Sequence, residues 1–357
     1  MKLNIDNDIR KAKTIPSKFY HSPKVYRTLK KLFNRSWQFV GDTELLQKNN
    51  THPGILLEGM VDEPYVLAKD GEKFSCMSNV CTHRGNIICE KAAKTKNLVC
   101  GYHGRQFNID GKMKFMPEFE NVENFPSESD NLPQIEMDLW KNMIFIINDK
   151  KCEITELIGP MVERLSWLPV EEFKYKPELS RVYNVKANWA LYCDNYLEGF
   201  HIPFVHKDLN QALEYDEYFT EGIDNTVLQI GVGKDNEHTF DLPKNHQDYG
   251  KNVAAYYFFL FPNMMFNFYP WGLSVNVVKP KSPEETQVQY YTYVWKEEIM
   301  EKGAGSGVDN VELEDEEIVE SVQKGVKSKA YDRGKYSPKR EIGVHYFHKL
   351  IQKYYSF

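Results

Sequence analysis

Long hydrophobic runs are missing from this sequence of 357 residues. The longest apolar stretches fall well below the roughly 18 residues that a transmembrane helix needs, so we expect no membrane span. The first residues, MKLNIDNDIRKAK, lack the apolar core of a secretory signal. These two absences predict a cytoplasmic protein.

The sequence also has a small net charge and few cysteines. The net charge of -6 gives no reason to expect nucleic acid or an anionic membrane as a partner. The six cysteines are expected to be thiols or metal ligands, because structural disulfides do not persist in a reducing compartment. No GxGxxG motif follows an expected strand, and GAGSG at 303–307 is better explained as a linker.

Aromatic residues, in contrast, are abundant, with 22 Tyr and 21 Phe, and they suit large packed pockets. The length suggests two domains. From Trp37 to about residue 149, short apolar runs are cut by Gly, Pro and charges, which predicts small antiparallel strands. Beyond about residue 150 the pattern mixes strands with helices.

Two half-sites stand in the stretch CTHRGNIICEKAAKTKNLVCGYHG, namely Cys81-x-His83 and Cys100-x-x-His103. A zinc site is one interpretation, but zinc ribbons usually pair two cysteines within one loop. A Rieske [2Fe–2S] cluster needs two cysteines on one iron and two histidines on the other, which matches one thiol and one imidazole per loop. The pattern favours the cluster. Three glycines are expected to let the backbone turn close to the sulfurs: Gly85, Gly101 and Gly104.

A second constellation lies in NWALYCDNYLEGFHIPFVHKDL, where His201 and His206 are five residues apart. Helical spacing places Asp194, Glu198 and His201 along one face. On an unbroken helix His206 would point away from His201, so we expect a break at Pro203 that lets the imidazoles converge. Two histidines and a distant carboxylate form the facial triad of non-haem Fe(II) oxygenases.

The third ligand of such a triad is expected on the acidic segment VELEDEEIVESVQKG. Its candidates are Glu312, Glu314, Asp315, Glu316 and Glu317. Acidic residues also favour a helix start without binding any metal, so the residues alone leave the choice open. Ile318, Val322 and Val326 stand at helical spacing and predict the apolar face of this helix.

Together these motifs resemble the catalytic α subunit of the Rieske non-haem iron oxygenases. The resemblance runs from LKKLFNRSWQFVG through both half-sites and DNYLEGFHIPFVH to GVHYFH, and the stretch CDNYLEGFH looks most like the choline monooxygenase branch. It implies an α+β protein with an antiparallel-β Rieske domain at 38–150. It also implies a helix-grip catalytic domain at 151–357, to which the helical residues 1–37 belong.

The resemblance also implies roles for single residues. The cluster would be held by two cysteines and two histidines: Cys81, Cys100, His83 and His103. The mononuclear iron would be held by His201, His206 and Asp315. Glu198 matches a bridging carboxylate, which in a homotrimer would link His103 of one subunit to His201 of the next. Where many members carry Trp after the second half-site, this chain has Arg105.

The activity implied is O2 activation at Fe(II) with electrons from the cluster, followed by oxygen insertion into a small organic substrate. The branch points to monooxygenation or demethylation of a quaternary ammonium compound, such as choline or a betaine. NAD(P)H would act through a separate flavin or ferredoxin reductase. An aromatic ring-hydroxylating dioxygenase is the main alternative, and a pure Rieske electron carrier is a further one.

A run of aromatic residues in the second half bears on the substrate. Side chains alternate along a strand, so we expect about half of the run to face the cavity above the iron. Its members are Tyr256, Tyr257, Phe258, Phe259, Phe266, Phe268, Tyr269 and Trp271. Ring faces at a cavity would suit either a flat aromatic substrate or a quaternary ammonium.

Overall fold

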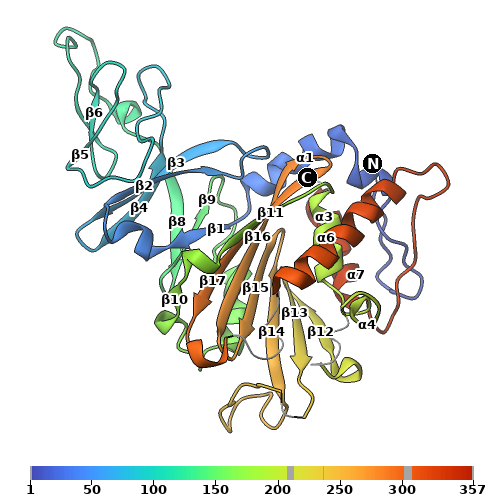
Figure 1. The fold of residues 1–357 in the computed structure, drawn as a ribbon. Coiled ribbons are helices and arrows are strands. Elements are labelled where there is room, and N and C mark those ends of the chain that lie inside the picture. Colours follow the sequence, from blue (N-terminus) through green and yellow to red (C-terminus); the bar gives the residue numbers. More distant parts are fainter. Residues whose placement is uncertain (1, 207–212, 236, 301–307, 356–357) are drawn as a thin grey trace. The chain divides into compact units, whose positions relative to one another are not determined.

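The computed structural model describes residues 2–206, 213–235, 237–300 and 308–355 (Figure 1). The expected linker GAGSG lies outside the described residues. The chain divides into two compact units, one formed by Asn34–Lys151 and the other by Met1–Phe33 with Cys152–Phe357. None of the helices in the described part of the chain combines the length and the hydropathy that a membrane crossing requires.

The unit Asn34–Lys151 is built from antiparallel strands. Its six-stranded sheet has the order β1 (Gln38–Asp42), β9 (Met143–Ile147), β8 (Gln134–Trp140), β4 (Lys73–Ser78), β3 (Glu63–Asp70) and β2 (Thr51–Leu56). A second sheet has the order β5 (Asn97–Val99), β6 (Gln106–Asn108) and β7 (Met113–Phe115). All five residues of β9, MIFII, are buried, which explains why this strand is continuously apolar.

The other unit contains an eight-stranded antiparallel sheet. Seven strands follow the order β10 (Lys174–Tyr175), β17 (Glu285–Val294), β16 (Gly272–Ser282), β15 (Met264–Tyr269), β14 (Val253–Leu260), β13 (Thr226–Val232) and β12 (Phe219–Ile223). The eighth, β11 (Arg181–Val185), also pairs with β17.

The α-helices of this unit are α1 (Pro23–Asn34), α2 (Thr155–Arg164), α3 (Trp189–Tyr196), α4 (Ile202–Val205), α6 (Val308–Gly325) and α7 (Ile342–Tyr355). Short 3-10 helices in the chain are η1 (Ser17–Tyr20), η2 (Thr43–Leu46), η3 (Glu128–Asp130), η4 (Val170–Glu172), η5 (Pro177–Leu179), η6 (Tyr215–Glu217) and η7 (Glu297–Ile299).

The long helix α7 packs on strands β12 and β13 of the sheet. Its buried face carries Val344, Phe347, Leu350 and Ile351. The ring of Phe347 meets Phe259 of β14 at 5.2 Å and Trp189 of α3 at 5.7 Å, both edge to face. This core joins the sheet, α7 and the start of α3, and so fixes the helix that leads to the histidine pair.

The prediction that Ile318, Val322 and Val326 form the buried apolar face of α6 is wrong for two of the three residues. Ile318 and Val322 are exposed, and only Val326 is buried. The buried face instead carries Glu312, Val319 and Gln323 with Val326. Polar side chains occupy it because α6 packs against α3, where Gln323 accepts a hydrogen bond from the backbone N–H of Asn188. A prediction from hydrophobic spacing alone therefore identified the solvent-exposed face of this helix as the buried one.

Candidate metal centres

Two loops of the smaller unit bring the Cys-His half-sites together, and they close in the same way. The N–H of Gly85 donates to the carbonyl of Cys81 at 2.9 Å, and the N–H of Gly104 donates to that of Cys100 at 3.1 Å. Both glycines have positive φ, 72° and 73°, which other residues adopt at a cost. Gly101, also expected to serve as a turn residue, does not have positive φ.

The thiols and imidazoles of the two loops face each other. Cys81 and Cys100 are buried, and the rings of His83 and His103 lie 4.8 Å apart. Burial raises the pKa of the Cys81 thiol. Burial acts in the same direction on Cys100, but hydrogen bonds from the backbone of Tyr102 and His103 and from the side chains of Cys81 and Asn86 together outweigh it and lower the pKa of that thiol. Nδ1 of His83 is buried without a hydrogen-bond partner. This orphaned nitrogen and two thiols fit a Cys2His2 cluster.

Arg105, which departs from the family pattern, connects the two ligand loops. Its guanidinium is 2% exposed and lies 2.6 Å from the carboxylate of Asp130. The guanidinium carbon lies over the rings of Phe107 and Phe125, 5.6 and 5.5 Å from their centroids. Thr82, between the ligands of the first loop, donates to the carbonyl of Asp130 at 2.7 Å. Asp130 thus receives bonds from both loops, a connection that the sequence did not reveal.

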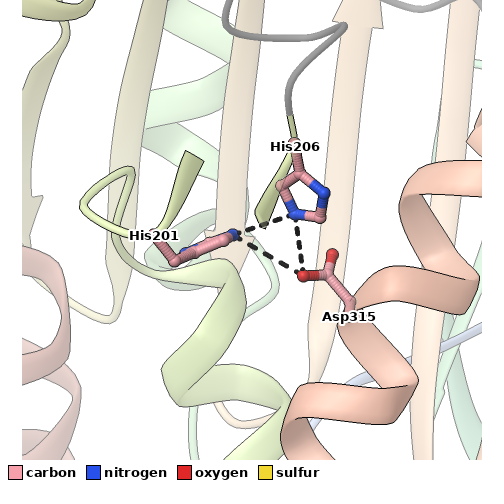
Figure 2. Close-up of side chains that lie close together, drawn as sticks. All are labelled: His201, His206 and Asp315. Carbon is pink, nitrogen blue, oxygen red and sulfur yellow. Dashed lines mark hydrogen bonds and ion pairs between the residues drawn. The ribbon is translucent and has the colours of Figure 1, made fainter. Parts of the chain in front are cut away.

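The second group lies in the larger unit and consists of His201, His206 and Asp315 (Figure 2). Nε2 of His206 is 2.9 Å from Oδ1 of Asp315 and 3.2 Å from Nε2 of His201. Nε2 of His201 is 3.6 Å from the same carboxylate oxygen. Two imidazole nitrogens and one carboxylate oxygen that converge in this way fit a facial-triad Fe(II) site.

The local backbone that carries the histidines differs from expectation. Helix α3 ends at Tyr196, so Asp194, Glu198 and His201 do not share one helical face. Pro203 does not break a helix, because it occupies the first turn of the one-turn helix α4, where proline is tolerated. His201 and His206 are the residues at the two ends of α4. A short helix between two turns, rather than a kink, therefore makes the imidazoles converge.

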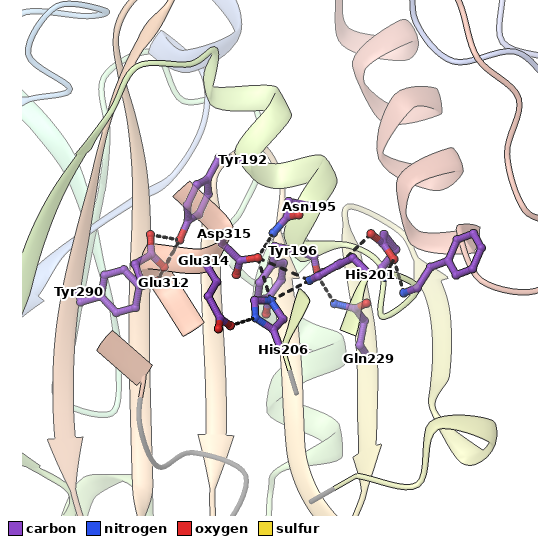
Figure 3. Close-up of polar contacts among 12 residues, drawn as sticks. Tyr192, Asn195, Tyr196, His201, His206, Gln229, Tyr290, Glu312, Glu314 and Asp315 are labelled. Atoms are coloured by element: carbon purple, nitrogen blue, oxygen red, sulfur yellow. Dashed lines mark hydrogen bonds and ion pairs between the residues drawn. The ribbon is translucent and has the colours of Figure 1, made fainter. Parts of the chain in front are cut away.

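Each imidazole is oriented by a second carboxylate (Figure 3). Nδ1 of His201 lies 2.7 Å from Glu198, and Nδ1 of His206 lies 2.7 Å from Glu314. Burial lowers the pKa of His206, but Asp315 and Glu314 more than reverse this and raise it. Carboxylates on the far ring nitrogen are typical of metal-binding histidines, since they leave Nε2 free as a ligand.

The five acidic candidates on α6 have different environments. Asp315 faces the histidines and also accepts a hydrogen bond from Asn195 at 2.6 Å. Glu314 contacts the far side of His206, and Glu312 is buried against two tyrosines. Glu317 is exposed. The sequence contained no signal for the role of Glu314, because its partner is 108 residues away.

A cavity of about 130 Å³ adjoins the triad. About half of the eight aromatic residues in the run were expected to face this cavity. Among the described residues, only Tyr257 and Tyr269 of that run line it. The other six are buried elsewhere in the unit. The remaining tyrosines of the cavity are Tyr192, Tyr196, Tyr218 and Tyr290. The lining is therefore rich in tyrosine, with the rings drawn from helices and strands alike.

Comparison with known families gives two matches along the chain. Residues 36–126 match the Rieske [2Fe-2S] domain, and residues 166–356 match the ring hydroxylating alpha subunit (catalytic domain). The chloroplastic choline monooxygenase of Spinacia oleracea is 30% identical over 96% of this chain and 78% of that protein. The carnitine monooxygenase oxygenase subunit of Escherichia coli K12 is 29% identical over 97% of this chain and 95% of that protein.

Solved structures show the same fold. A quaternary ammonium Rieske monooxygenase superimposes with a TM-score of 0.83 at 24% identity, covering 99% of both chains. Naphthalene 1,2-dioxygenase from Rhodococcus sp. gives a TM-score of 0.76 at 14% identity over 96% of this chain and 94% of that one. The expected α+β class, with a Rieske domain and a catalytic domain of helices on an antiparallel sheet, is confirmed.

Proposed function

Because the chain belongs to the Rieske-type ring-hydroxylating oxygenase α subunits, we propose that it inserts an oxygen atom from O2 into a small quaternary ammonium compound. The relatives act on choline and carnitine by name, which favours monooxygenation or demethylation over dihydroxylation of an aromatic ring. The match to a catalytic domain argues against a pure electron carrier.

The observation on which this proposal depends most is the cavity beside His201, His206 and Asp315. Six tyrosines line it together with the three candidate ligands. A methylated ammonium has no N–H to donate, so proteins bind it over aromatic faces, at about 0.5–2 kcal/mol for each ring. A tyrosine-rich cavity next to a candidate iron site is therefore suited to such a cation.

The residues take the following proposed parts. Cys81, Cys100, His83 and His103 would hold the cluster, and the triad would hold Fe(II), which supplies O2 activation when bound. Glu198 and Glu314 hold the imidazoles with Nε2 directed toward Asp315. Glu198 would also accept an N–H from His103 of the partner subunit in a homotrimer, and so link the two iron centres.

The remaining parts of the system are proposals as well. Electrons would come from NAD(P)H through a separate flavin or ferredoxin reductase, since the sequence offers no dinucleotide motif of its own. We place the protein in the cytoplasm, where reduced thiols are available for the cluster.

Oxygen uptake tests the proposal. The iron-loaded protein, supplied with a reductase and NADH, is presented with choline, L-carnitine, glycine betaine and benzoate. We expect uptake coupled to product formation for at least one of the three cations, and none in the His206→Ala variant. Coupled turnover of benzoate alone, with a dihydroxylated product, would replace the proposal with the aromatic dioxygenase alternative.

A further inference from the structure

The cavity contains a buried carboxylate that neither metal centre uses. Glu312 lies three residues before Asp315 on α6 and is 3% exposed. The hydroxyl of Tyr192 donates to both of its oxygens, at 2.9 and 2.7 Å, and the hydroxyl of Tyr290 donates to Oε2 (Figure 3). All three side chains line the cavity.

No cation compensates this carboxylate within the described residues. No Lys, Arg or His of that part of the chain forms an ion pair with Glu312, and neither Lys nor Arg is among the described residues that line the cavity. Burying an unpaired carboxylate is expensive, and two tyrosine hydroxyls offset only part of that cost. Burial accordingly raises the pKa of Glu312 to about 7, although the two tyrosines lower it.

The surroundings of Glu312 suit a cation without N–H groups. The two tyrosines that donate to the carboxylate belong to the six whose side chains line the cavity. Rings and a carboxylate act together on such a cation, because the rings attract it through their faces while the carboxylate supplies the opposite charge. Three residues along a helix correspond to about 4.5 Å, so the charge lies roughly one turn from the candidate iron ligand Asp315.

We propose that Glu312, held by Tyr192 and Tyr290, is the counter-charge that selects a cationic substrate and places its ammonium group beside the iron. This inference rests on the proposed function, since it assigns the residue that recognises the proposed substrate class. The substrate provides a positive charge that none of the described residues brings to the buried carboxylate. Glu312 is then a specificity residue, and it takes no part in holding either metal.

The test compares choline with 3,3-dimethyl-1-butanol, in which a neutral carbon replaces the nitrogen at nearly the same shape. Binding of each to the iron-loaded enzyme is measured by calorimetry without reductant. The unmodified enzyme is expected to prefer choline. In Glu312→Gln, choline affinity should fall about tenfold to a hundredfold, as for other buried charge pairs, while the neutral alcohol binds unchanged. Glu312→Asp, which keeps the charge, should keep part of the preference.

Matched measurements separate the possible outcomes. Glu317→Gln, an exposed residue on the same helix, is the control and should bind choline like the unmodified enzyme. The inference fails if Glu312→Gln binds choline as tightly as the unmodified enzyme, and the proposed function would then survive. If the unmodified enzyme binds choline and 3,3-dimethyl-1-butanol equally well, the inference fails whatever the variants show. If it turns over benzoate but no trimethylammonium compound, the proposed function itself fails.

Discussion

At the scale of single residues, the carboxylates behind the histidines decide what the imidazoles can do. Glu198 and Glu314 each accept a hydrogen bond from the Nδ1–H of one imidazole, so that both Nε2 lone pairs are directed toward Asp315. An imidazole without such a partner could present either nitrogen or rotate away. Glu314 orients the imidazole of His206 although the Glu314 side chain is 48% exposed, because His206 itself is buried.

Removing Glu314 should therefore weaken the mononuclear site without destroying the fold. We predict that Glu314→Ala lowers Fe(II) affinity about tenfold to a hundredfold, as is typical for the loss of a carboxylate behind a histidine ligand. Titration of the apo mononuclear site with Fe(II) under argon measures this. Glu317→Ala is the control, because Glu317 is exposed on the same helix and is not among the described residues that line the cavity. Equal affinities in both variants would contradict the orienting role.

Glu198 should behave differently, because its proposed work includes the link between subunits. In Glu198→Gln the amide oxygen can still accept the hydrogen bond that the backbone N–H of His201 donates to Oε2 of Glu198 at 3.1 Å. We predict that this variant keeps both metals but loses most coupled turnover. Single-turnover and steady-state rates, normalised to iron content, are the measurement. Unchanged rates in a fully metallated protein would reject the bridging role.

At the scale of elements, two networks hold loops in place. In the smaller unit, Arg105 and Thr82 both bond to Asp130 in η3, which fixes the two ligand loops to each other. The guanidinium is buried and paired, so it brings a positive charge close to the cluster ligands at a tolerable cost. A fixed charge at such a position favours the reduced cluster, which carries one more negative charge.

Opposite substitutions in this pair should therefore shift the cluster potential in opposite directions. Arg105→Gln removes the cation and should lower the reduction potential, whereas Asp130→Asn removes the anion and should raise it, each on the order of tens of millivolts. Redox titration followed by EPR reports the potential directly. A shift in the same direction in both variants would mean that the pair acts only by loosening the loops.

In the larger unit, Asp248 clamps helix α2 to strand β14. Its carboxylate is 1% exposed and meets Arg164 of α2 at 2.8 Å, Lys251 at 2.9 Å and the hydroxyl of Tyr256 at 2.9 Å. Burial alone would raise the pKa of Asp248, but these hydrogen bonds and the Arg164 charge lower it below the ordinary value of 3.8. The ionised form is therefore the stabilising one.

A depressed carboxyl pKa stabilises the fold above the ordinary pKa and loses that effect as pH falls through the folded value. We predict that Asp248→Asn lowers the free energy of unfolding by about 3–5 kcal/mol at pH 7, since it removes the closer of the two carboxylates that Arg164 contacts and leaves only Glu221, at 3.6 Å. The difference from the unmodified protein should narrow below about pH 4. Urea denaturation between pH 3 and pH 8 measures it, with the exposed Asp241→Asn as control. A difference that stays constant down to pH 3 would contradict this account.

At the scale of the whole molecule, the two candidate metal centres belong to separate compact units. The four candidate cluster ligands lie within Asn34–Lys151, and the candidate iron triad lies within the unit that includes Cys152–Phe357. Each candidate centre therefore draws its ligands from one unit, so we expect each to form without the other.

Separate units predict separate loss of iron. We expect Cys81→Ala to lose the visible absorbance of the cluster and keep about one iron atom per chain, while His206→Ala keeps the colour and about two irons. Iron analysis and absorbance spectra of purified proteins check this. Cys89→Ala, in the same loop region but outside both half-sites, should keep about three. Loss of both centres from either single variant would show that they form cooperatively.

Local spacing made much of this predictable. The half-sites at Cys81 and Cys100 are closed by hydrogen bonds that span only four residues, each ending at a glycine. His201 and His206 are likewise separated by a single helical turn. Spacing of this kind involves only neighbouring residues, so it pointed to a cluster and a histidine pair. The α+β oxygenase was implied by the family resemblance that these motifs carry.

The choice among five acids, the buried face of α6 and the tyrosines around Glu312 were decided only by tertiary structure. Tyr192 and Tyr290 meet across 98 residues of chain, and Glu314 meets His206 across 108. Helical periodicity indicated the face with Ile318, which is exposed, because burial around a polar site reverses the usual order of apolar inside and charged outside. Which carboxylate of a helix faces a metal or a substrate depends on the helix against which it packs, and no local pattern in the sequence specifies that contact.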